Sequence, residues 1–202
     1  MTSEDFSPYI WVNGFDEADV KLFYDQFHCL ELTPNLQEIP IYINSFGGSV
    51  HGYLAMRSLI KRSVKPVATI VVGKAMSAGA LLAACGTKGY RYVAPDSDIM
   101  IHEASLGAED KNSEFQNQAK MLDRLNKTML RCLGEDTNLS ADEWKTKLKD
   151  AGNVDLFLTP AQCKKIGLTD HIKLPIVVPY PATYSLEAID FKKFSSHRLD
   201  LE

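Results

Sequence analysis

One serine in the sequence stands where its hydroxyl could act as a nucleophile. The apolar, β-branched run Val67–Val72 predicts a buried strand that stops at Gly73, and the Ala/Leu-rich run Ala78–Ala84 predicts a tightly packed helix. Ser77 lies in the turn between them. There, free N–H groups and the positive end of the helix dipole would meet a developing negative charge, which is what acyl transfer requires. The competing interpretation is that Ser77 only caps the helix.

A glycine-rich turn earlier in the chain has the same arrangement of strand, turn and helix. Ile41–Asn44 predicts a strand, Gly47 and Gly48 lie in the turn, and a helical pattern continues to about Arg62. Adjacent glycines allow N–H groups to point into a cavity, although such a turn can also be no more than a tight connection. Two such units predict parallel strands with α/β layering, whose carboxyl ends meet at one edge of the sheet. The two turns can therefore converge on one site.

Two further polar residues accompany predicted strands. His102 ends the strand Asp98–His102, where a lone histidine is most often a structural hydrogen-bonding group. Its place at another strand end makes it a candidate for the same site. Asp155 lies inside the apolar run Val154–Leu158, where a carboxylate is rarely buried without a partner.

Capping residues and apolar spacing define the other elements. In the first half of the chain they predict a strand at Tyr9–Val12, a helix from Glu17 to Leu32 capped by Asp16, a loop bracketed by Pro34 and Pro40, and a strand at Tyr90–Val93. In the second half they predict a polar connection from Leu106 to Asn112 and a long amphipathic helix from Ser113 to Leu133 ended by Gly134. A helix after the capping box that starts at Ser140, a helix opened by Thr159 and closed by Gly167, and a last strand from Leu168 to Ile172 follow. After Pro175, proline, aromatic and basic residues predict an extended tail that either docks on a partner or frays.

Composition and charge exclude several functional classes. The chain has 202 residues, 45% of them hydrophobic and 24% charged, which suits one globular domain with a sizeable core. A net charge of −4 without a basic patch argues against nucleic-acid binding, and no apolar stretch is long enough to span a membrane. The first residues lack the pattern of a signal peptide, and four widely spaced cysteines indicate reduced, mostly buried thiols. We therefore expect a cytoplasmic protein without metal or cofactor.

Four segments, in order, resemble the proteolytic subunit family of the Clp protease, a self-compartmentalising serine peptidase. The resemblance runs from about Tyr9 to Ile172 and is specific because all four segments occur together, whereas any one alone would be weak. The segments are Ile41-Tyr42-Ile43-Asn44-Ser45-x-Gly47-Gly48-Ser49, Gly73-x-Ala75-x-Ser77-Ala78-Gly79-Ala80, Arg91 through Pro95 to Ile99-Met100-Ile101-His102, and Asp155-x-Phe157-Leu158-Thr159-x-Ala161 with Gly167-Leu168-x-Asp170.

The resemblance implies a set of site residues. It identifies Ser77, His102 and Asp155 as a catalytic triad, in which His102 is the general base and Asp155 holds its imidazole. The N–H groups of Gly47 and Ala78 are then expected to form the oxyanion hole. The partner that Asp155 needs in its apolar run is, on this interpretation, His102.

The resemblance also implies a fold and an assembly. We expect an α/β protein of the ClpP/crotonase-like fold, with repeated β-turn-α units and a protruding handle helix at Ser113–Leu133. Residues 1–174 are expected to form the peptidase domain and residues 175–202 a Pro/aromatic tail. The function implied is that of an ATP-dependent-type serine endopeptidase, which cleaves unfolded proteins or peptides inside a heptameric ring or a tetradecamer of two rings.

Some positions depart from the family pattern. Met76 stands in place of a small residue, Phe46 in place of a proline, and Glu103-Ala104 in place of Gln-Pro after the histidine. The family's longer N-terminal pore segment is nearly absent, which predicts a wider entrance and leaves the partnership with an AAA+ unfoldase open. The tail after Pro175 is long enough to take over a docking role.

Three alternatives stay open beside the leading interpretation. A divergent, virus-encoded relative could act as a capsid-maturation peptidase on a dedicated substrate. A non-catalytic subunit could shape a mixed Clp-like ring, although the three triad residues Ser77, His102 and Asp155 argue against it. A crotonase-like protein acting on coenzyme A thioesters would use two glycine turns without a serine nucleophile, and the same three residues disfavour it.

Overall fold

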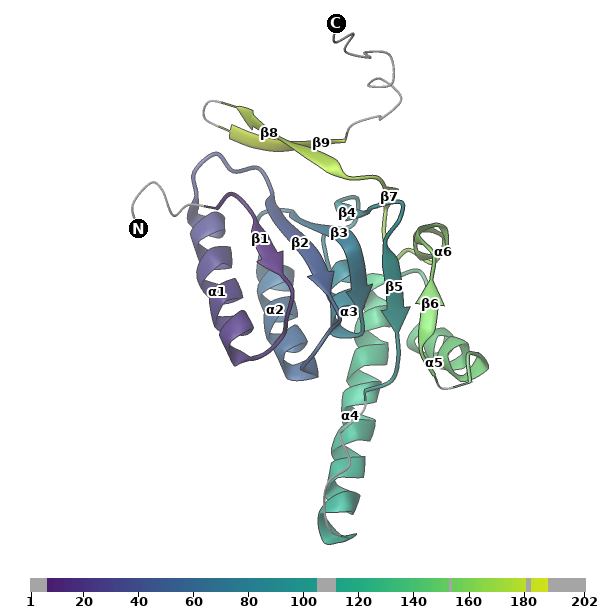
Figure 1. Cartoon of the computed structure of the whole chain (residues 1–202). Helices are drawn as coiled ribbons and strands as arrows, with labels where there is room; N and C mark the ends of the chain where they lie inside the picture. Colours follow the sequence, from purple (N-terminus) through teal and green to yellow (C-terminus); the bar gives the residue numbers. More distant parts are fainter. Residues whose placement is uncertain (1–6, 105–111, 153, 181–182, 189–202) are drawn as a thin grey trace, which may run out of the picture.

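The computed structural model describes residues 7–104, 112–152, 154–180 and 183–188 (Figure 1). The helices and strands in this part of the chain are, in order, β1 (Ile10–Val12), α1 (Glu17–Leu32), β2 (Ile39–Ser45), α2 (Val50–Arg62), β3 (Val67–Met76), α3 (Ala78–Ala84), β4 (Arg91–Val93), β5 (Asp98–Ile101), α4 (Asn112–Asp136), α5 (Ala141–Asp150), β6 (Leu156–Leu158), α6 (Pro160–Lys165), β7 (His171–Ile172), β8 (Pro175–Tyr180) and β9 (Thr183–Ala188).

The parallel strands form a sheet whose helices cover one face. The strand order is β1-β2-β3-β4-β7, all in parallel, while β5 pairs with β3 as well and β6 joins β5 in the antiparallel direction. Helices α1, α2 and α3 lie behind this sheet, and α4 extends well beyond it (Figure 1). The predicted α/β fold with β-turn-α units and a protruding helix is confirmed.

Strand β3 changes partners halfway along its length. Its first part, Thr69–Val71, pairs with β4, and its second part, Lys74–Met76, pairs with β5. Gly73, with φ of +81°, lies between the two parts, and the register to β2 shifts at the same level. The prediction that the strand stops at Gly73 was therefore wrong. The glycine bends the strand, and β5 supplies new hydrogen bonds that carry it on to Ser77.

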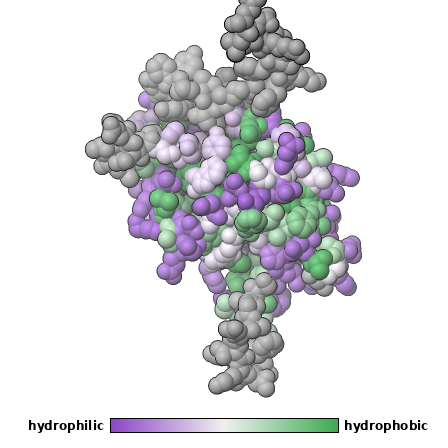
Figure 2. All heavy atoms as spheres, in the orientation of Figure 1, coloured by the Kyte–Doolittle hydropathy of each residue, from purple (hydrophilic) through white to green (hydrophobic). Residues whose placement is uncertain are grey.

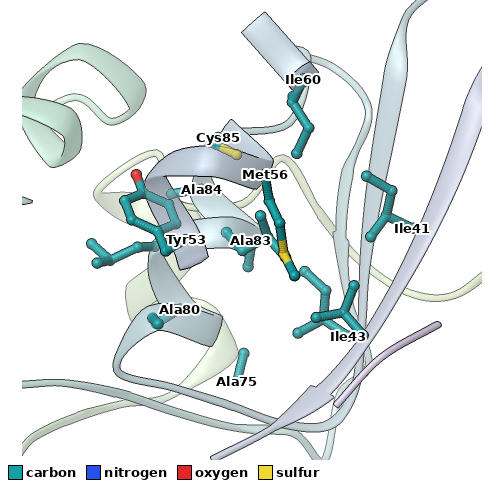
Figure 3. Packing of buried hydrophobic residues seen from close by; sticks show 14 of the residues in the cluster. Ile41, Ile43, Tyr53, Met56, Ile60, Ala75, Ala80, Ala83, Ala84 and Cys85 are labelled. Carbon is teal, nitrogen blue, oxygen red and sulfur yellow. The ribbon is translucent and has the colours of Figure 1, made fainter. Parts of the chain in front are cut away.

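The core lies between the sheet and helices α2 and α3 (Figure 3). Met56 and Ile60 project from α2 toward the side chains of β2, whereas Tyr53 points toward α3, and all three are buried (Figure 3). Every residue of α3 is buried, and its small side chains allow close contact with the sheet. A Cβ on Gly79 would lie only 3.4 Å from Ser45 Cβ. This close packing fixes the start of α3, and hence Ser77, against the end of β2.

Two predicted boundaries moved because the residues at them have other roles. Helix α4 continues through Gly134 to Asp136, and a Cβ on Gly134 would lie 2.9 Å from the backbone N of Ala141. This glycine lets α4 approach α5 and does not end the helix. The predicted loop up to Pro40 ends early, since β2 starts at Ile39. The pairing of β2 with β1 begins at Ile41, one residue after Pro40. Pro40 therefore lies where β2 has no partner on that side, and a proline is tolerated there because it has no N–H to donate.

A buried arginine joins the sheet to the helices that follow it. Arg91 is 3% exposed, and its Nε and Nη2 donate to the carboxylate of Asp170 at 2.9 and 2.6 Å. Its Nη1 donates to the carbonyl oxygens of Ala84, Asp136 and Gly167 at 3.3, 2.6 and 2.8 Å. One side chain thus connects the ends of α3 and α4 with the turn after α6. It fixes the position of α4, which forms one wall of the candidate site.

The C-terminal part differs from the predicted extended tail. Strand β7 covers only His171–Ile172, because Gly167 to Asp170 form the turn that holds Arg91. It is not the last strand, since β8 and β9 pair as an antiparallel hairpin. The β-branched run Ile176–Val178 favours a strand, and the surrounding prolines obscured this signal in the sequence. Residues 189–202 of the predicted tail and most of the predicted connection at residues 106–112 lie outside the described residues.

The surface of the described part is mixed in character. Hydrophilic and hydrophobic residues are interspersed over the face shown in Figure 2. No helix among the described residues has both the length and the apolar composition needed to cross a membrane.

Candidate active site

Ser77 sits in a strained turn between β3 and α3. Its φ of 52° and ψ of −121° lie in a region that residues with a side chain rarely adopt. Its N–H donates to the carbonyl of Met100 at 2.8 Å, and its own carbonyl accepts from the N–H groups of Ala80 and Leu81. Its side chain makes no capping hydrogen bond to α3. Ser77 thus occupies the N-cap position of α3, but its hydroxyl does not serve as a cap.

The glycine turn after β2 lies directly against Ser77. A Cβ on Gly47 would be 2.7 Å from Ser77 Cβ and 3.2 Å from the backbone N of Ala78, so no larger residue fits there. Gly47 and Gly48 both have positive φ, of 99° and 151°. The predicted convergence of the two turns is confirmed by this contact.

The two N–H groups predicted for the oxyanion hole differ in their surroundings. The N–H of Gly47 donates to Ser45 Oγ at 3.0 Å, and Ser45 Oγ donates to the carbonyl of Asn13 at 2.8 Å. The predicted donor of Gly47 thus already has an acceptor. Gly48, which follows it, lines the same cavity as Ser77. Ala78 begins α3 and is buried beside the glycine turn.

His102 shares this cavity with Ser77. It directly follows β5, whose Met100 carbonyl accepts the Ser77 N–H, so one hydrogen bond sets the distance between the two segments. The imidazole is half-buried and lines the cavity, and it makes no hydrogen bond to another described residue. The structure brings these two predicted residues together.

Asp155 lies next to His102 in the strand register but not in the cavity. In the antiparallel pair of β5 and β6, Ile101 is opposite Leu156, and one residue further the same register sets His102 opposite Asp155. Side chains opposite each other project to the same face of a sheet. Asp155 is exposed, however, and makes no hydrogen bond to another described residue. Phe157, two residues further along the same short edge strand, is exposed as well, so this face of β6 is not part of the core.

The cavity around Ser77 has a polar side and an apolar side. Its volume is about 360 Å³, within the range of small-ligand sites. The polar side carries the hydroxyls of Ser49 and Ser77 and two imidazoles, whereas the apolar side is formed by residues of the glycine turn, α2 and α4. The residues that line the cavity include Phe46, Gly48, Ser49, Val50, His51, Ser77, His102 and Leu125.

Sequence reasoning missed the walls of this cavity. Phe46 is 72% exposed, and the ammonium of Lys74 lies 4.0 Å from the centre of its ring. His51 stands on the first turn of α2, and Leu125 comes from the apolar stripe of α4, which the sequence could assign equally to a core or a partner. For His51 the only signal was its nearness to the glycine turn, whereas Phe46 stood out in the sequence only as a replacement for a proline.

The remaining reactive groups lie apart from this cavity. None of the four cysteines forms a disulfide, and Cys85, Cys132 and Cys163 are buried, as predicted. Burial raises the pKa of the Cys85 and Cys163 thiols to about 12, which keeps them neutral and unreactive. Among the described residues, no group of three or more His, Cys, Asp or Glu side chains is arranged to hold a metal ion.

Comparison with known proteins identifies the family of this chain. The sequence profile of the Clp protease family matches residues 10–174, which is most of the chain. The chain belongs to the Clp protease family. It is 37% identical over 136 residues to the ATP-dependent Clp protease proteolytic subunit of Deinococcus radiodurans. The matched region is 67% of this chain and 65% of that relative, so the chain spans about two thirds of the relative's length. The resemblance stated from the four sequence segments is confirmed.

Proposed function

We propose that this protein is a serine endopeptidase subunit that cleaves peptide bonds of unfolded proteins or peptides inside an oligomeric chamber. The observation that carries the proposal is the conformation of Ser77, which is strained, makes no capping bond, and shares a cavity with an imidazole. A structural serine at a helix start would instead adopt an extended conformation and bond to the first turn, as Ser140 does before α5.

In the first half of the reaction, Ser77 becomes acylated. Its Oγ attacks the carbonyl carbon of the scissile bond while the imidazole of His102 takes the hydroxyl proton. The negative charge on the carbonyl oxygen is met by the N–H of Ala78 and by an N–H of the glycine turn. Since Ser45 Oγ accepts the N–H of Gly47, we assign the second donor to Gly48. His102 then passes its proton to the leaving amine as the C–N bond breaks.

In the second half, water releases the acyl group. His102 takes a proton from the water, whose oxygen attacks the ester carbon, and returns a proton to Ser77 Oγ as the C–O bond breaks. Asp155 orients the imidazole and stabilises its charged form. The β5–β6 register supports this role, because continuing it by one residue sets Asp155 opposite His102.

The walls of the cavity indicate which substrates it accepts. Leu125 and Val50 present apolar surface beside the nucleophile, which favours an apolar side chain next to the scissile bond. We further propose that the subunits assemble into a heptameric ring or a tetradecamer in the cytoplasm, with α4 in the contact between rings. The relative is described as ATP-dependent, so an AAA+ unfoldase is the partner class to test.

Labelling with a fluorophosphonate probe tests the proposal. The probe reacts with an activated serine, so we expect labelling of the wild type and at least a 100-fold slower reaction in Ser77→Ala and His102→Ala, in line with the roughly 10⁴-fold or larger effects of triad residues. The matched controls are Ser58→Ala and His28→Ala, which change exposed residues on α2 and α1 and should label like the wild type. Labelling that survives Ser77→Ala would contradict the assignment.

A non-catalytic ring subunit is the second candidate function. The exposed carboxylate of Asp155 favours it, since an imidazole without this partner is a weaker base. A folded, oligomeric wild type that does not label, alone or with an added AAA+ unfoldase, would support this second function over the first.

A further inference from the structure

A second pocket lies beside the candidate active site, between the first turns of α1 and α2. These two helix starts are neighbours at the lower edge of the sheet domain in Figure 1. The pocket has a volume of about 790 Å³, more than twice the volume of the active-site cavity. Phe15 and Val20 line it from one side, and Ala55 lines it from α2. Neither the proposed reaction nor the family resemblance gives this pocket a role.

The pocket adjoins the cavity that contains Ser77. Ser49 and His51 line both spaces, so these two side chains form the boundary between them. Phe15, which lines the pocket, also packs against the glycine turn that borders the cavity. A Cβ on Gly48 would lie 3.2 Å from Phe15 Cβ, and a Cβ on Gly52 would lie 2.2 Å from Phe15 O. The two spaces are therefore neighbours that meet at Ser49 and His51.

The charged groups at the rim of the pocket are largely engaged within α1. Asp16 accepts the N–H of Asp19 in a capping box, and Lys21 pairs with Asp25. The groups that face an incoming ligand are then apolar surface, the exposed imidazole of His51 and the exposed carboxylate of Glu17. This chemistry suits an apolar side chain on an extended peptide, with the imidazole free to hydrogen-bond to the peptide backbone.

We propose that the pocket between α1 and α2 is an accessory substrate subsite. It takes an apolar side chain of the same polypeptide whose scissile bond lies at Ser77, and His51 contacts the backbone of that polypeptide where it crosses between the two spaces. The proposal rests on the proposed peptidase function and deepens it. It predicts that cleavage depends on residues well away from the scissile bond.

The test fills the pocket without touching the catalytic groups. Ala55 is exposed in the pocket, so Ala55→Trp adds an indole there without removing buried packing. Peptides of increasing length, extended on either side of one scissile bond and carrying a leucine in the extension, are the substrates. In the wild type we expect kcat/KM to rise about tenfold once the leucine reaches the pocket, the effect of burying most of one such side chain. In Ala55→Trp this gain disappears, whereas the shortest peptide is cleaved as in the wild type.

The matched control is Ala18→Trp. It makes the same change at an exposed position on α1 that does not line the pocket, and the length dependence should persist. Circular dichroism and oligomer size are measured for both variants. If Ala55→Trp does not fold, the smaller change Ala55→Leu replaces it with Ala18→Leu as its control, and the gain should shrink in Ala55→Leu alone.

A binding experiment separates this proposal from the proposed function. Anisotropy of a labelled long peptide on the full-length Ser77→Ala protein needs no turnover, and Ala55→Trp in that background should weaken binding about tenfold. A wild type that does not react with the fluorophosphonate probe would count against the peptidase function. Equal binding of the peptide by Ala55→Trp and Ala18→Trp, both in the Ser77→Ala background, would overturn the subsite. A change in oligomer size caused only by Ala55→Trp would assign the pocket to a subunit contact and overturn it as well.

Discussion

Ser77 holds a backbone conformation that a serine adopts only at an energetic cost. Its φ of 52° and ψ of −121° suit glycine, and a residue with a Cβ there costs about 1–3 kcal/mol. The Ser77 backbone is held in place by three hydrogen bonds, two accepted by its carbonyl and one donated by its N–H. The contact with Gly47 holds it as well. A nucleophile held in this way needs no reorganisation before it attacks, so the strain is consistent with the proposed role.

The strain gives a stability prediction that does not depend on activity. Ser77→Gly should raise the free energy of unfolding by about 1 kcal/mol relative to Ser77→Ala, because only the glycine relieves the positive φ. Urea unfolding of the two variants measures the difference, and neither should label with the probe. A glycine variant less stable than the alanine variant would show that the turn is not strained.

The ion pair of Arg91 and Asp170 predicts how stability responds to acid. Burial raises the pKa of Asp170, but the hydrogen bonds and charge of Arg91, with the N–H groups of Gly89 and Arg91, outweigh burial and bring it below its usual 3.8. A lowered folded pKa means that the stabilisation is complete above pH 3.8 and is lost as the pH falls from there toward the folded pKa. Urea unfolding at several pH values should show this loss.

The control for the acid response is Asp170→Asn. It should be about 3–5 kcal/mol less stable near neutral pH, since Arg91 is left buried without its carboxylate. Its stability should also fall less steeply than that of the wild type below about pH 4. An equally steep fall would mean that other carboxylates control the acid response.

At the scale of elements, the sequence predicted helix starts better than it predicted the role of glycines. Asp16, Ser140 and Thr159 each cap a helix as predicted, because these bonds are local and follow from residues three apart. The capping box was predicted only at Ser140, and the structure forms one at all three positions. Gly73 and Gly134 were both predicted to end an element, yet both lie inside one. Their roles depend on contacts with β5 and α5, which come from other parts of the chain. The local sequence around each glycine cannot predict such contacts.

The contact at Gly134 reverses the usual effect of a helix substitution. In an exposed helix, Gly→Ala stabilises by about 1 kcal/mol. Here the new Cβ would lie 2.9 Å from the backbone N of Ala141, which cannot move alone. We therefore expect Gly134→Ala to lower the free energy of unfolding by about 1–3 kcal/mol through overpacking between α4 and α5. Stabilisation by the substitution would show that the two helices separate easily.

At the scale of the molecule, the candidate site is assembled from segments that the sequence separates widely. The turns at Gly47 and Ser77 could be expected to meet, because parallel strands bring their carboxyl ends together. The wall contributed by Leu125 could not be expected, since it depends on the angle at which α4 leaves the sheet. Arg91 sets that angle through the Asp136 carbonyl, and a long-range hydrogen bond of this kind has no signature in local sequence.

The separation of the C-terminal hairpin from the main sheet leads to the last prediction. Strands β8 and β9 form a sheet of their own and contact mainly each other, whereas Pro175 at the start of β8 is buried. A chain that ends after Pro175 should therefore keep the core between α2, α3 and the main sheet. We expect its free energy of unfolding to lie within about 0.5 kcal/mol of the full chain, with the same fluorophosphonate labelling. A much less stable chain would make the hairpin part of the fold, and a folded chain with altered oligomer size would assign it to assembly.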